Sequence, residues 1–212
     1  MTLAPVAPRL VRPHDDARGV LIWRFETALS ALSSSAVGGG WGSIDWVIAI
    51  GVGLEYDRMD LDDHAAEVAT AVGAKGRGVA LFTAVDVAKV RHGLSAGVRV
   101  DATVGVTIPT WAATEHDGVD LAPRPGTVNV VAQLPVALEP SAAVNAVVTI
   151  TEAKAQALSE AGVQGTGTAS DAVVVCWPPS GAPERFAGPR STWGARLARA
   201  THAAIAAGLD PP

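Results

Sequence analysis

The stretch from Pro140 to Trp177 constrains the fold of this chain more than any other. Its first part predicts an amphipathic helix, because apolar residues recur at spacings of three and four between Val144 and Leu158. Ser141 is placed to cap the start of this helix and Gly162 to end it, since glycine readily adopts the left-handed conformation found at helix ends. The apolar, β-branched run AVVVC that follows Asp171 then predicts a buried strand.

The loop between this helix and this strand, VQGTGTAS, has the composition of a ligand site. Thr166, Thr168 and Ser170 supply three hydroxyl groups. Gly165 and Gly167 lack the side chains that would keep a ligand away from the backbone. The backbone amides of residues 165–168 could also donate hydrogen bonds to an oxyanion. A polar cluster between a helix end and a buried strand is therefore the first candidate site.

The predicted helix has a polar stripe and a lone lysine on opposite sides. At 100° per residue, one stripe contains Asn145, Thr149, Glu152 and Gln156, whereas Lys154 points into an apolar arc. The ordinary interpretation is a solvated stripe and a lysine whose stem lies along apolar surface, with its ammonium group in water. The functional interpretation places Lys154 or Glu152 in a cleft. An ideal helix cannot easily direct both side chains to one site.

Further blocks of sequence accompany this stretch in a characteristic order. They read LSSSAVGGGW at 32–41, EYDRMD at 55–60, TVGVTIPTWA at 103–112, PGTVNVVAQLP at 125–135 and GPRSTWGARLARATHAAI at 188–205. Together with TEAKAQAL and GTGTASD of the central stretch, this ordered set resembles the adenosylcobinamide amidohydrolase family of corrinoid salvage enzymes. The blocks cover nearly the whole chain.

The resemblance implies hydrolysis of the amide that joins aminopropanol to the corrin side chain of adenosylcobinamide. The product would be adenosylcobyric acid, through which a cell re-enters cobalamin biosynthesis from salvaged precursors. Cobalt would arrive within the corrinoid substrate, so no separate cofactor and no protein-bound metal are expected. Two alternatives stay open: a non-catalytic corrinoid-binding module, and an amidase that acts on another bulky amide.

An amidase must activate a nucleophile, stabilise an oxyanion and protonate a leaving amine. The chain has no H-E-x-x-H motif. We rank Glu152 first as general base, because it lies on the polar stripe and could face a cleft without a desolvation cost. Asp171 is second: it begins a buried strand, so it must be paired, cap the loop amides or be catalytic. Lys154 is expected to give electrostatic support or to form an ion pair. The nucleophile stays open between a hydroxyl group, such as that of Thr166 or Thr168, and an activated water molecule.

Substrate-binding residues are expected in the blocks that carry the resemblance and along the central helix. They are Ser34, Ser35, Gly38, Gly39, Asn129, Asn145, Ser170, Arg190 and Trp193. Six tryptophans and several glycine loops suit a large, amide-fringed ligand. The carboxylates of residues 55–64 are explained by the start of the helix that follows, so no metal site is predicted there.

Charge and apolar content exclude several classes of protein. The net charge is −5 with only three lysines, so a nucleic-acid surface is not expected. No apolar run reaches the roughly 18 residues of a membrane span, and the first residues do not read as a signal peptide. Cys176 is the single cysteine and falls inside a predicted strand. We expect a cytoplasmic protein without a membrane partner, and a homo-oligomer stays open.

The rest of the chain predicts a single α/β or α+β domain in which layers of mixed β-sheet are flanked by helices. A loosely ordered arm is expected over residues 1–18, followed by one domain over residues 19–212. A two-layered sheet enclosed by helices is the alternative arrangement. The other predicted strands are 20–26, 31–37, 46–52, 78–83, 98–108 and 127–134, and the other predicted helices begin near residues 65, 84 and 191.

Overall fold

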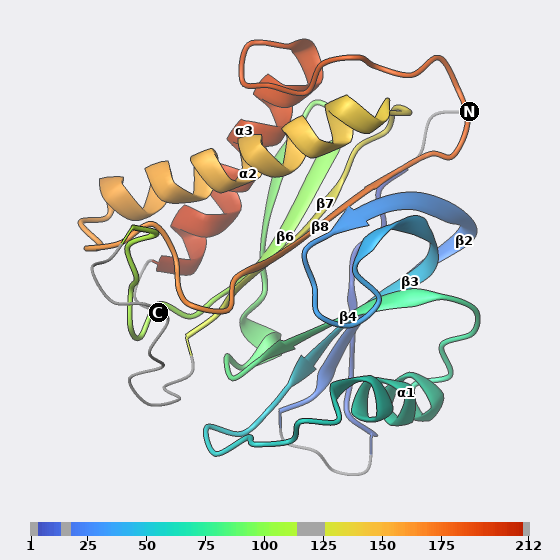
Figure 1. Ribbon diagram of the computed structural model, residues 1–212, viewed down its shortest axis with the longest axis vertical. Helices are drawn as coiled ribbons and strands as arrows, with labels where there is room; N and C mark the ends of the chain where they lie inside the picture. Colours follow the sequence, from blue (N-terminus) through green and yellow to red (C-terminus); the bar gives the residue numbers. More distant parts are fainter. Residues whose placement is uncertain (1–3, 14–17, 114–125, 210–212) are drawn as a thin grey trace.

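The computed structural model describes residues 4–13, 18–113 and 126–209. Three helices lie on a mixed sheet (Figure 1). The helices are α1 (Leu61–Ala71), α2 (Pro140–Glu160) and α3 (Thr192–Leu209). The strands are β1 (Arg9–Val11), β2 (Val20–Ser33), β3 (Gly40–Gly51), β4 (Gly78–Thr83), β5 (Arg91–Ser95), β6 (Val98–Val104), β7 (Val128–Gln133) and β8 (Ala172–Trp177).

The strands form one sheet in the order β4-β3-β2-β8-β7-β6-β5, with β1 added along β2. The pairs β3–β4 and β7–β8 are parallel, and the other pairs are antiparallel. The predicted single α/β domain with a mixed sheet is therefore confirmed. The stretch from Pro140 to Trp177 completes a β–α–β unit, because α2 connects the parallel strands β7 and β8.

The long strand β2 divides the sheet into two layers. Its first half pairs with β1 and its second half pairs with β8, and its register with β3 shifts between Arg24 and Leu29. Such a bulge bends a strand. A buried cluster lies between the two halves and includes Leu21, Val47 and Leu81 from one half and Val131, Val174 and Cys176 from the other. The one sheet thus also adopts the two-layered arrangement of the alternative.

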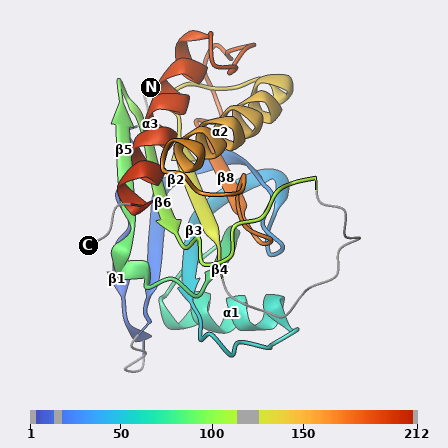
Figure 2. The same cartoon turned by 90° about the vertical axis from the view of Figure 1, so that its left-hand side faces the viewer.

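Helices cover both outer faces of the folded sheet (Figure 2). On one side, α2 and α3 pack on β6, β7 and β8 through a large cluster rich in alanine and valine. On the other side, α1 packs on β2, β3 and β4 through a smaller cluster. All six residues of β7 are buried, because one face meets the helices and the other meets the second sheet layer.

Several predicted elements differ from the structure. Residues 20–33 form one strand rather than two, because the polar residues near Glu26 mark the bulge and not a turn. Residues 84–92 form no α-helix: a 3-10 turn at Val87–Lys89 leads directly into β5. The predicted strand at 98–108 ends at Val104.

The expected loosely ordered arm is wrong for part of residues 1–18. Arg9–Val11 form β1 and pair with Val20–Ile22 of β2. Val6 is held further along by Gln133, whose side chain accepts a hydrogen bond from the Val6 N–H at 2.9 Å and donates one to its carbonyl at 2.8 Å. Backbone pairing with β2 and the side-chain amide of Gln133 on β7 therefore tie this segment to both halves of the sheet. No helix in the described part of the chain is long and apolar enough to cross a membrane.

The ends of α2 were predicted with mixed success. Glu139 occupies the N-cap position, so the prediction that Ser141 caps the helix is wrong. Pro140 lies in the first turn, where proline is suitable because an N–H there would have no partner within the helix. Gly162 follows the helix with φ of 76°, which confirms the predicted stop.

Candidate active site

The candidate site lies at the edge of the sheet where the parallel strands β7 and β8 begin. Asp171 immediately precedes β8, and Thr127 immediately precedes β7. The loop from α2 to β8 brings Thr168 to the same edge, and Lys154 reaches it from α2. The predicted helix, loop and strand therefore converge on one cluster of polar side chains.

Asp171 is the centre of this cluster and accepts four hydrogen bonds. Its Oδ1 accepts from the Val128 N–H at 2.9 Å and from the Thr168 hydroxyl at 2.5 Å. Its Oδ2 accepts from the Thr168 N–H at 3.1 Å and from Lys154 Nζ in a short ion pair. A carboxylate offers about four lone-pair positions, so its acceptor capacity is filled by groups of the chain.

The ion pair of Lys154 and Asp171 is largely shielded from solvent. Their side chains are 10% and 12% exposed. The prediction that Lys154 lies in the apolar arc of the helix is confirmed, and so is the prediction that Asp171 requires a partner. Removing either partner would leave the other as an uncompensated buried charge, which is strongly unfavourable.

Gly167 lies directly against the ion pair, and its lack of a side chain is required there. A Cβ atom at this position would overlap Asp171 Oδ2 and would lie 2.5 Å from Lys154 Nζ. The expectation that this glycine lets a ligand approach the backbone stays a prediction. The group that approaches in the structure is the ion pair of the site itself.

A second loop, at 105–113, supports the glycine–threonine loop. The Thr110 N–H donates to the Gly167 carbonyl at 2.8 Å, and the Thr166 N–H donates to the Thr110 carbonyl at 2.9 Å. Gly165 packs on Pro109 and Thr110 so closely that a Cβ atom would not fit. This two-bond bridge fixes the position of the loop that carries Thr168.

The remaining hydroxyl groups of the loop have different surroundings. Ser170 Oγ is 2.8 Å from Thr127 Oγ1, so these hydroxyl groups link the starts of β8 and β7. Thr166 Oγ1 makes only a long contact, 3.5 Å, with the Thr110 carbonyl. Among the three predicted hydroxyl groups, that of Thr168 contacts the central carboxylate.

The backbone amides expected to form an oxyanion site are mostly engaged. The Gly165, Thr166 and Thr168 N–H groups donate to Val163, Thr110 and Asp171. The Gly167 N–H has no acceptor within the described part of the chain. It is the member of this group of four that can still donate to a ligand.

The polar stripe of α2 does not reach the cluster. Glu152 is exposed and forms no hydrogen bond with any described residue. Thr149 is buried and donates to the Ala187 carbonyl at 2.8 Å, and Asn145 contacts Gly188. The stripe thus faces the loop before α3 and the solvent, whereas the opposite arc carries Lys154 to the site.

The loop at 34–39, predicted to bind substrate, is held by local bonds. Ser34 Oγ accepts from the Val173 N–H at 3.0 Å, and Ser35 Oγ donates to the Ala80 carbonyl at 2.5 Å. A Cβ atom at Gly38 would overlap the Gly78 carbonyl, and one at Gly39 would overlap the Ser35 carbonyl. These residues fasten the end of β2 to β8 and β4, and contacts of theirs with substrate stay a prediction.

Asn129 is buried on β7, two residues after Thr127. Its side-chain amide donates to the Phe82 carbonyl at 2.9 Å, which joins β7 to the end of β4 across the two sheet layers. Its Oδ1 has no hydrogen-bond partner among the described residues. A substrate contact by Asn129 stays a prediction, and its structural role is the link between the layers.

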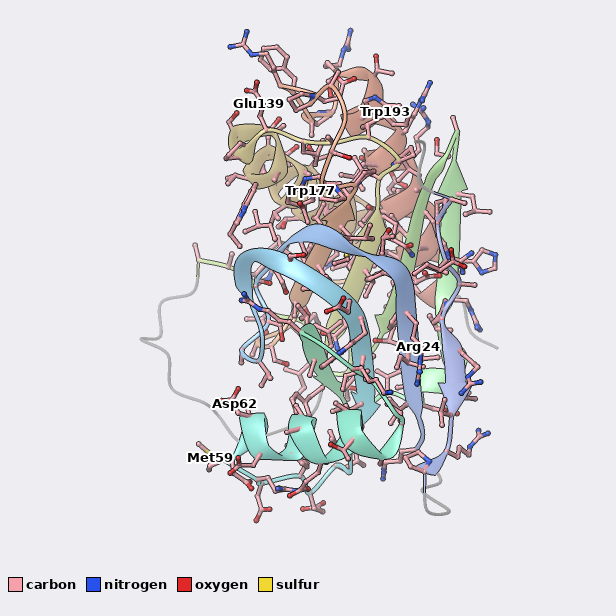
Figure 3. All side chains as sticks on the ribbon, turned by 90° about the vertical axis from the view of Figure 1, so that its right-hand side faces the viewer. Arg24, Met59, Asp62, Glu139, Trp177 and Trp193 are labelled. Atoms are coloured by element: carbon pink, nitrogen blue, oxygen red, sulfur yellow. The ribbon has the colours of Figure 1, made fainter. Side chains whose placement is uncertain are left out.

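Trp193 lies in the first turn of α3 (Figure 3), and Arg190 precedes that helix by two residues. Trp193 Nε1 donates to Glu184 Oε1 at 3.1 Å, and the Arg196 guanidinium lies 4.4 Å from the centre of the Trp193 ring. Arg190 is exposed and has no partner among the described residues. The described contacts do not connect these two residues to Asp171.

Other chemically active side chains have structural partners. His202 Nε2 lies 2.7 Å from Glu160 Oε2 and joins α3 to α2. Burial raises the pKa of the Cys176 thiol, so it is a poor nucleophile. Arg58 binds both Asp60 and Glu67, and its hydrogen bond lowers the pKa of Asp60 to about 2.

Sequence reasoning did not identify Thr110, Thr127 or the Val128 N–H as parts of this site. Thr110 belongs to a block that carries the resemblance, but no local pattern shows that it contacts residues more than fifty positions later. The partners follow from the register of the sheet, in which Asn129 lies opposite Ala172. A prediction that β7 and β8 pair in this parallel register would have placed Thr127 beside Ser170 and Val128 beside Asp171.

Comparison with known proteins gives two agreeing matches. Residues 7–211 match the model of a family described as adenosylcobinamide amidohydrolase. A protein of that same name from Halobacterium salinarum is 33% identical over 205 residues, which cover 88% of this chain and 87% of the relative. Both matches span the candidate site as well as the sheet that carries it.

Proposed function

The chain belongs to the adenosylcobinamide amidohydrolase family, and from this premise we propose that Thr168, Asp171 and Lys154 form its catalytic centre. The protein is an amidohydrolase that hydrolyses the aminopropanol amide of adenosylcobinamide. The products are adenosylcobyric acid and free aminopropanol. This reaction fits the salvage of cobinamide for cobalamin biosynthesis.

The hydrogen bond of 2.5 Å from the Thr168 hydroxyl to Asp171 Oδ1 is the observation that supports this centre best. A general base must lie within hydrogen-bond reach of the proton that it removes. Asp171 meets that condition for Thr168, and its other acceptor positions are filled by Val128, Thr168 N–H and Lys154. A water molecule would have to displace one of these donors, so we assign the nucleophile to Thr168.

The reaction then runs through two covalent steps. Thr168 Oγ1 attacks the amide carbonyl carbon as its proton passes to Asp171 Oδ1. The C–N bond breaks when that proton is delivered to the leaving nitrogen, which releases aminopropanol and leaves an ester on Thr168. Water attacks the ester while Asp171 accepts its proton, and Asp171 returns that proton to Thr168 Oγ1 as the ester C–O bond breaks. The substrate thus gains one water molecule and yields a carboxylic acid and an amine.

Two groups are placed to stabilise the negative charge that develops during attack. The Gly167 N–H is adjacent to the nucleophile and has no acceptor among the described residues, so we assign it to the oxyanion. Lys154 orients the carboxylate through Oδ2 and supplies a positive charge beside the same loop. Loss of one oxyanion donor typically lowers turnover about 100- to 1,000-fold.

Further parts of the proposal concern the surroundings of the reaction. Cobalt enters as part of the corrinoid substrate, and every step above uses groups of the chain. The described residues contain no group of three or more metal-ligating side chains placed to hold an ion.

A cytoplasmic location is supported by the free, buried thiol of Cys176, since reduced thiols are usual in reducing compartments.

Incubation of the purified protein with adenosylcobinamide tests the function. Mass spectrometry should show conversion to adenosylcobyric acid and equimolar aminopropanol. Binding without conversion would instead identify a corrinoid-binding module. Conversion of other bulky amides in preference to adenosylcobinamide, in a panel of substrates, would identify an amidase of different specificity.

A further inference from the structure

The two described segments that meet beside Thr168 carry no charged side chain. The segments 105–113 and 161–170 read GVTIPTWAA and AGVQGTGTAS, and neither contains an acidic, basic or histidine residue. The nearest charges on the site loop belong to Asp171 and Lys154, which neutralise each other and are mostly buried. What these segments offer to a ligand is hydroxyl groups, backbone amides and apolar side chains.

Two large apolar side chains on this surface are exposed. Ile108 is 42% exposed and Trp111 is 52% exposed. They lie on either side of Thr110 in sequence. The Thr110 N–H and carbonyl both form hydrogen bonds with the site loop, to Gly167 and Thr166. An exposed tryptophan beside a catalytic group suits a ligand contact. Covering its large apolar face with a ligand removes that face from water and stabilises the complex.

The position of Trp111 is fixed relative to the nucleophile. Thr110 pairs with Gly167, the residue immediately before Thr168, through a hydrogen bond of 2.8 Å. Gly165 allows this close packing, since a side chain there would collide with the Thr110 backbone. The backbone that carries Trp111 is therefore tied to the residue that precedes Thr168.

We infer that Ile108 and Trp111 form a ledge on which one face of the corrin ring packs, so that the scissile side chain reaches Thr168. The inference rests on the proposed function and deepens it. A corrin is a flat, largely apolar ring with a fringe of neutral amide side chains. The ledge supplies the apolar contact, and the uncharged hydroxyl groups and amides around it suit the fringe. The described segments 105–113 and 161–170 offer no charged side chain to an anionic ligand.

The chemistry of the reaction requires such a contact close to the nucleophile. The scissile amide is at the end of a side chain of the ring, so the ring itself must lie within the length of that side chain. Binding by a group that does not react positions the reacting carbonyl and reduces the entropy lost on reaching the transition state. A contact that is equal in the bound substrate and in the transition state changes KM and leaves kcat unchanged.

Steady-state kinetics of Trp111→Ala with adenosylcobinamide tests the ledge. We expect KM to rise about tenfold or more while kcat stays within about threefold, because one stacking surface is lost and the catalytic groups are intact. Trp111→Phe keeps an aromatic face and should stay within about threefold of the wild type in KM. Phe186→Ala is the control, since it removes an aromatic side chain that is 69% exposed on the loop before α3, and it should change neither constant.

A binding measurement separates this inference from the proposed reaction. Equilibrium dialysis of adenosylcobinamide, followed by its visible absorbance, should give a Kd about tenfold weaker for Trp111→Ala in the Thr168→Ala background than for Thr168→Ala alone. The ledge is refuted if KM and this Kd are both unchanged. If the wild type binds but does not hydrolyse adenosylcobinamide, the proposed function fails and the dialysis still decides on the ledge. If Trp111→Ala does not fold, Ile108→Ala takes its place in the dialysis, and its binding of adenosylcobinamide should be weaker than that of Thr168→Ala alone.

Discussion

Replacement of Gly167 by alanine should inactivate the enzyme without unfolding it. The added Cβ would overlap Asp171 Oδ2 and lie 2.5 Å from Lys154 Nζ. Ordinary contact begins near 3.5 Å, so the loop and the ion pair must separate by about 1 Å. The loop is bonded to Thr110 on both sides, so part of this movement must be taken by Asp171 and Lys154.

The magnitude follows from two separate effects. Inserting a methyl group into a packed site typically costs about 1–3 kcal/mol of stability, which is a fraction of the roughly 5–15 kcal/mol that holds a domain folded. A displacement of about 1 Å between catalytic groups can lower turnover about 100-fold. The variant should therefore remain folded and lose about 99% of its turnover.

Turnover of adenosylcobinamide and urea unfolding, measured on the same preparation, check this prediction. Gly53→Ala is the matched control, because a Cβ at Gly53 has its nearest neighbour at 3.8 Å and should alter neither quantity. If Gly167→Ala keeps more than half of the wild-type turnover, the ion pair beside Gly167 is not part of the catalytic centre.

Three further predictions concern charged side chains. Lys154→Met should abolish turnover and lower the free energy of unfolding by about 3 kcal/mol or more, because the buried Asp171 loses its counter-charge. Mass spectrometry of the product and urea unfolding would measure the two effects, and wild-type values of both would contradict the prediction. Glu152→Gln should keep turnover within about twofold, since the Glu152 side chain is exposed and forms no hydrogen bond or ion pair with a described residue. Near-complete loss of turnover would instead support Glu152 as general base. Asp60 should titrate at about 2 by carbon-13 NMR and return toward 3.8 in Arg58→Gln, since the Arg58 hydrogen bond lowers its pKa. Its contribution to stability is then complete above pH 3.8 and lost as the pH falls through 2, and an unshifted titration would contradict the pairing.

The central helix, loop and strand were predictable because each has a local signal. β8 is a run of buried β-branched residues, and Gly162 ends α2 in the left-handed conformation. The cost of an unpaired buried carboxylate predicted that Asp171 must have a partner. Helix geometry placed Lys154 opposite the polar stripe of α2, and the structure brings Lys154 and Asp171 together as an ion pair.

The buried face of α2 was harder to predict than its existence. The valines at 144 and 148 were expected to face the core, but they are exposed, and the core-facing residues include Ala142, Ala143, Ala146 and Ala153. In a chain rich in alanine these positions do not stand out by hydrophobicity. They are selected because small side chains allow α2 to pack closely on α3 and the sheet.

The ranking of Glu152 above Asp171 shows the limit of reasoning from one helix. A polar stripe can face a cleft or the solvent, and only the packing of α3 and the loop at 187–188 against α2 decides between them. The same limit applies to Thr110 and Thr127, whose contacts with the site loop come from the register of distant strands. Long-range pairing, and not local propensity, assembles this site.

The Thr168→Ala variant tests the central claim most directly, because it removes the hydroxyl group that donates to Asp171 and leaves the Thr168 N–H bond to the same carboxylate. Turnover of adenosylcobinamide should fall about 1,000-fold or more, while the Kd by equilibrium dialysis stays within about threefold of the wild-type KM. Thr168→Ser, which keeps a hydroxyl group, should retain measurable turnover. Thr166→Ala serves as the control from the same loop, since its hydroxyl makes only a contact of 3.5 Å. A Thr168→Ala variant that turns over within tenfold of the wild type would show that Thr168 is not the nucleophile.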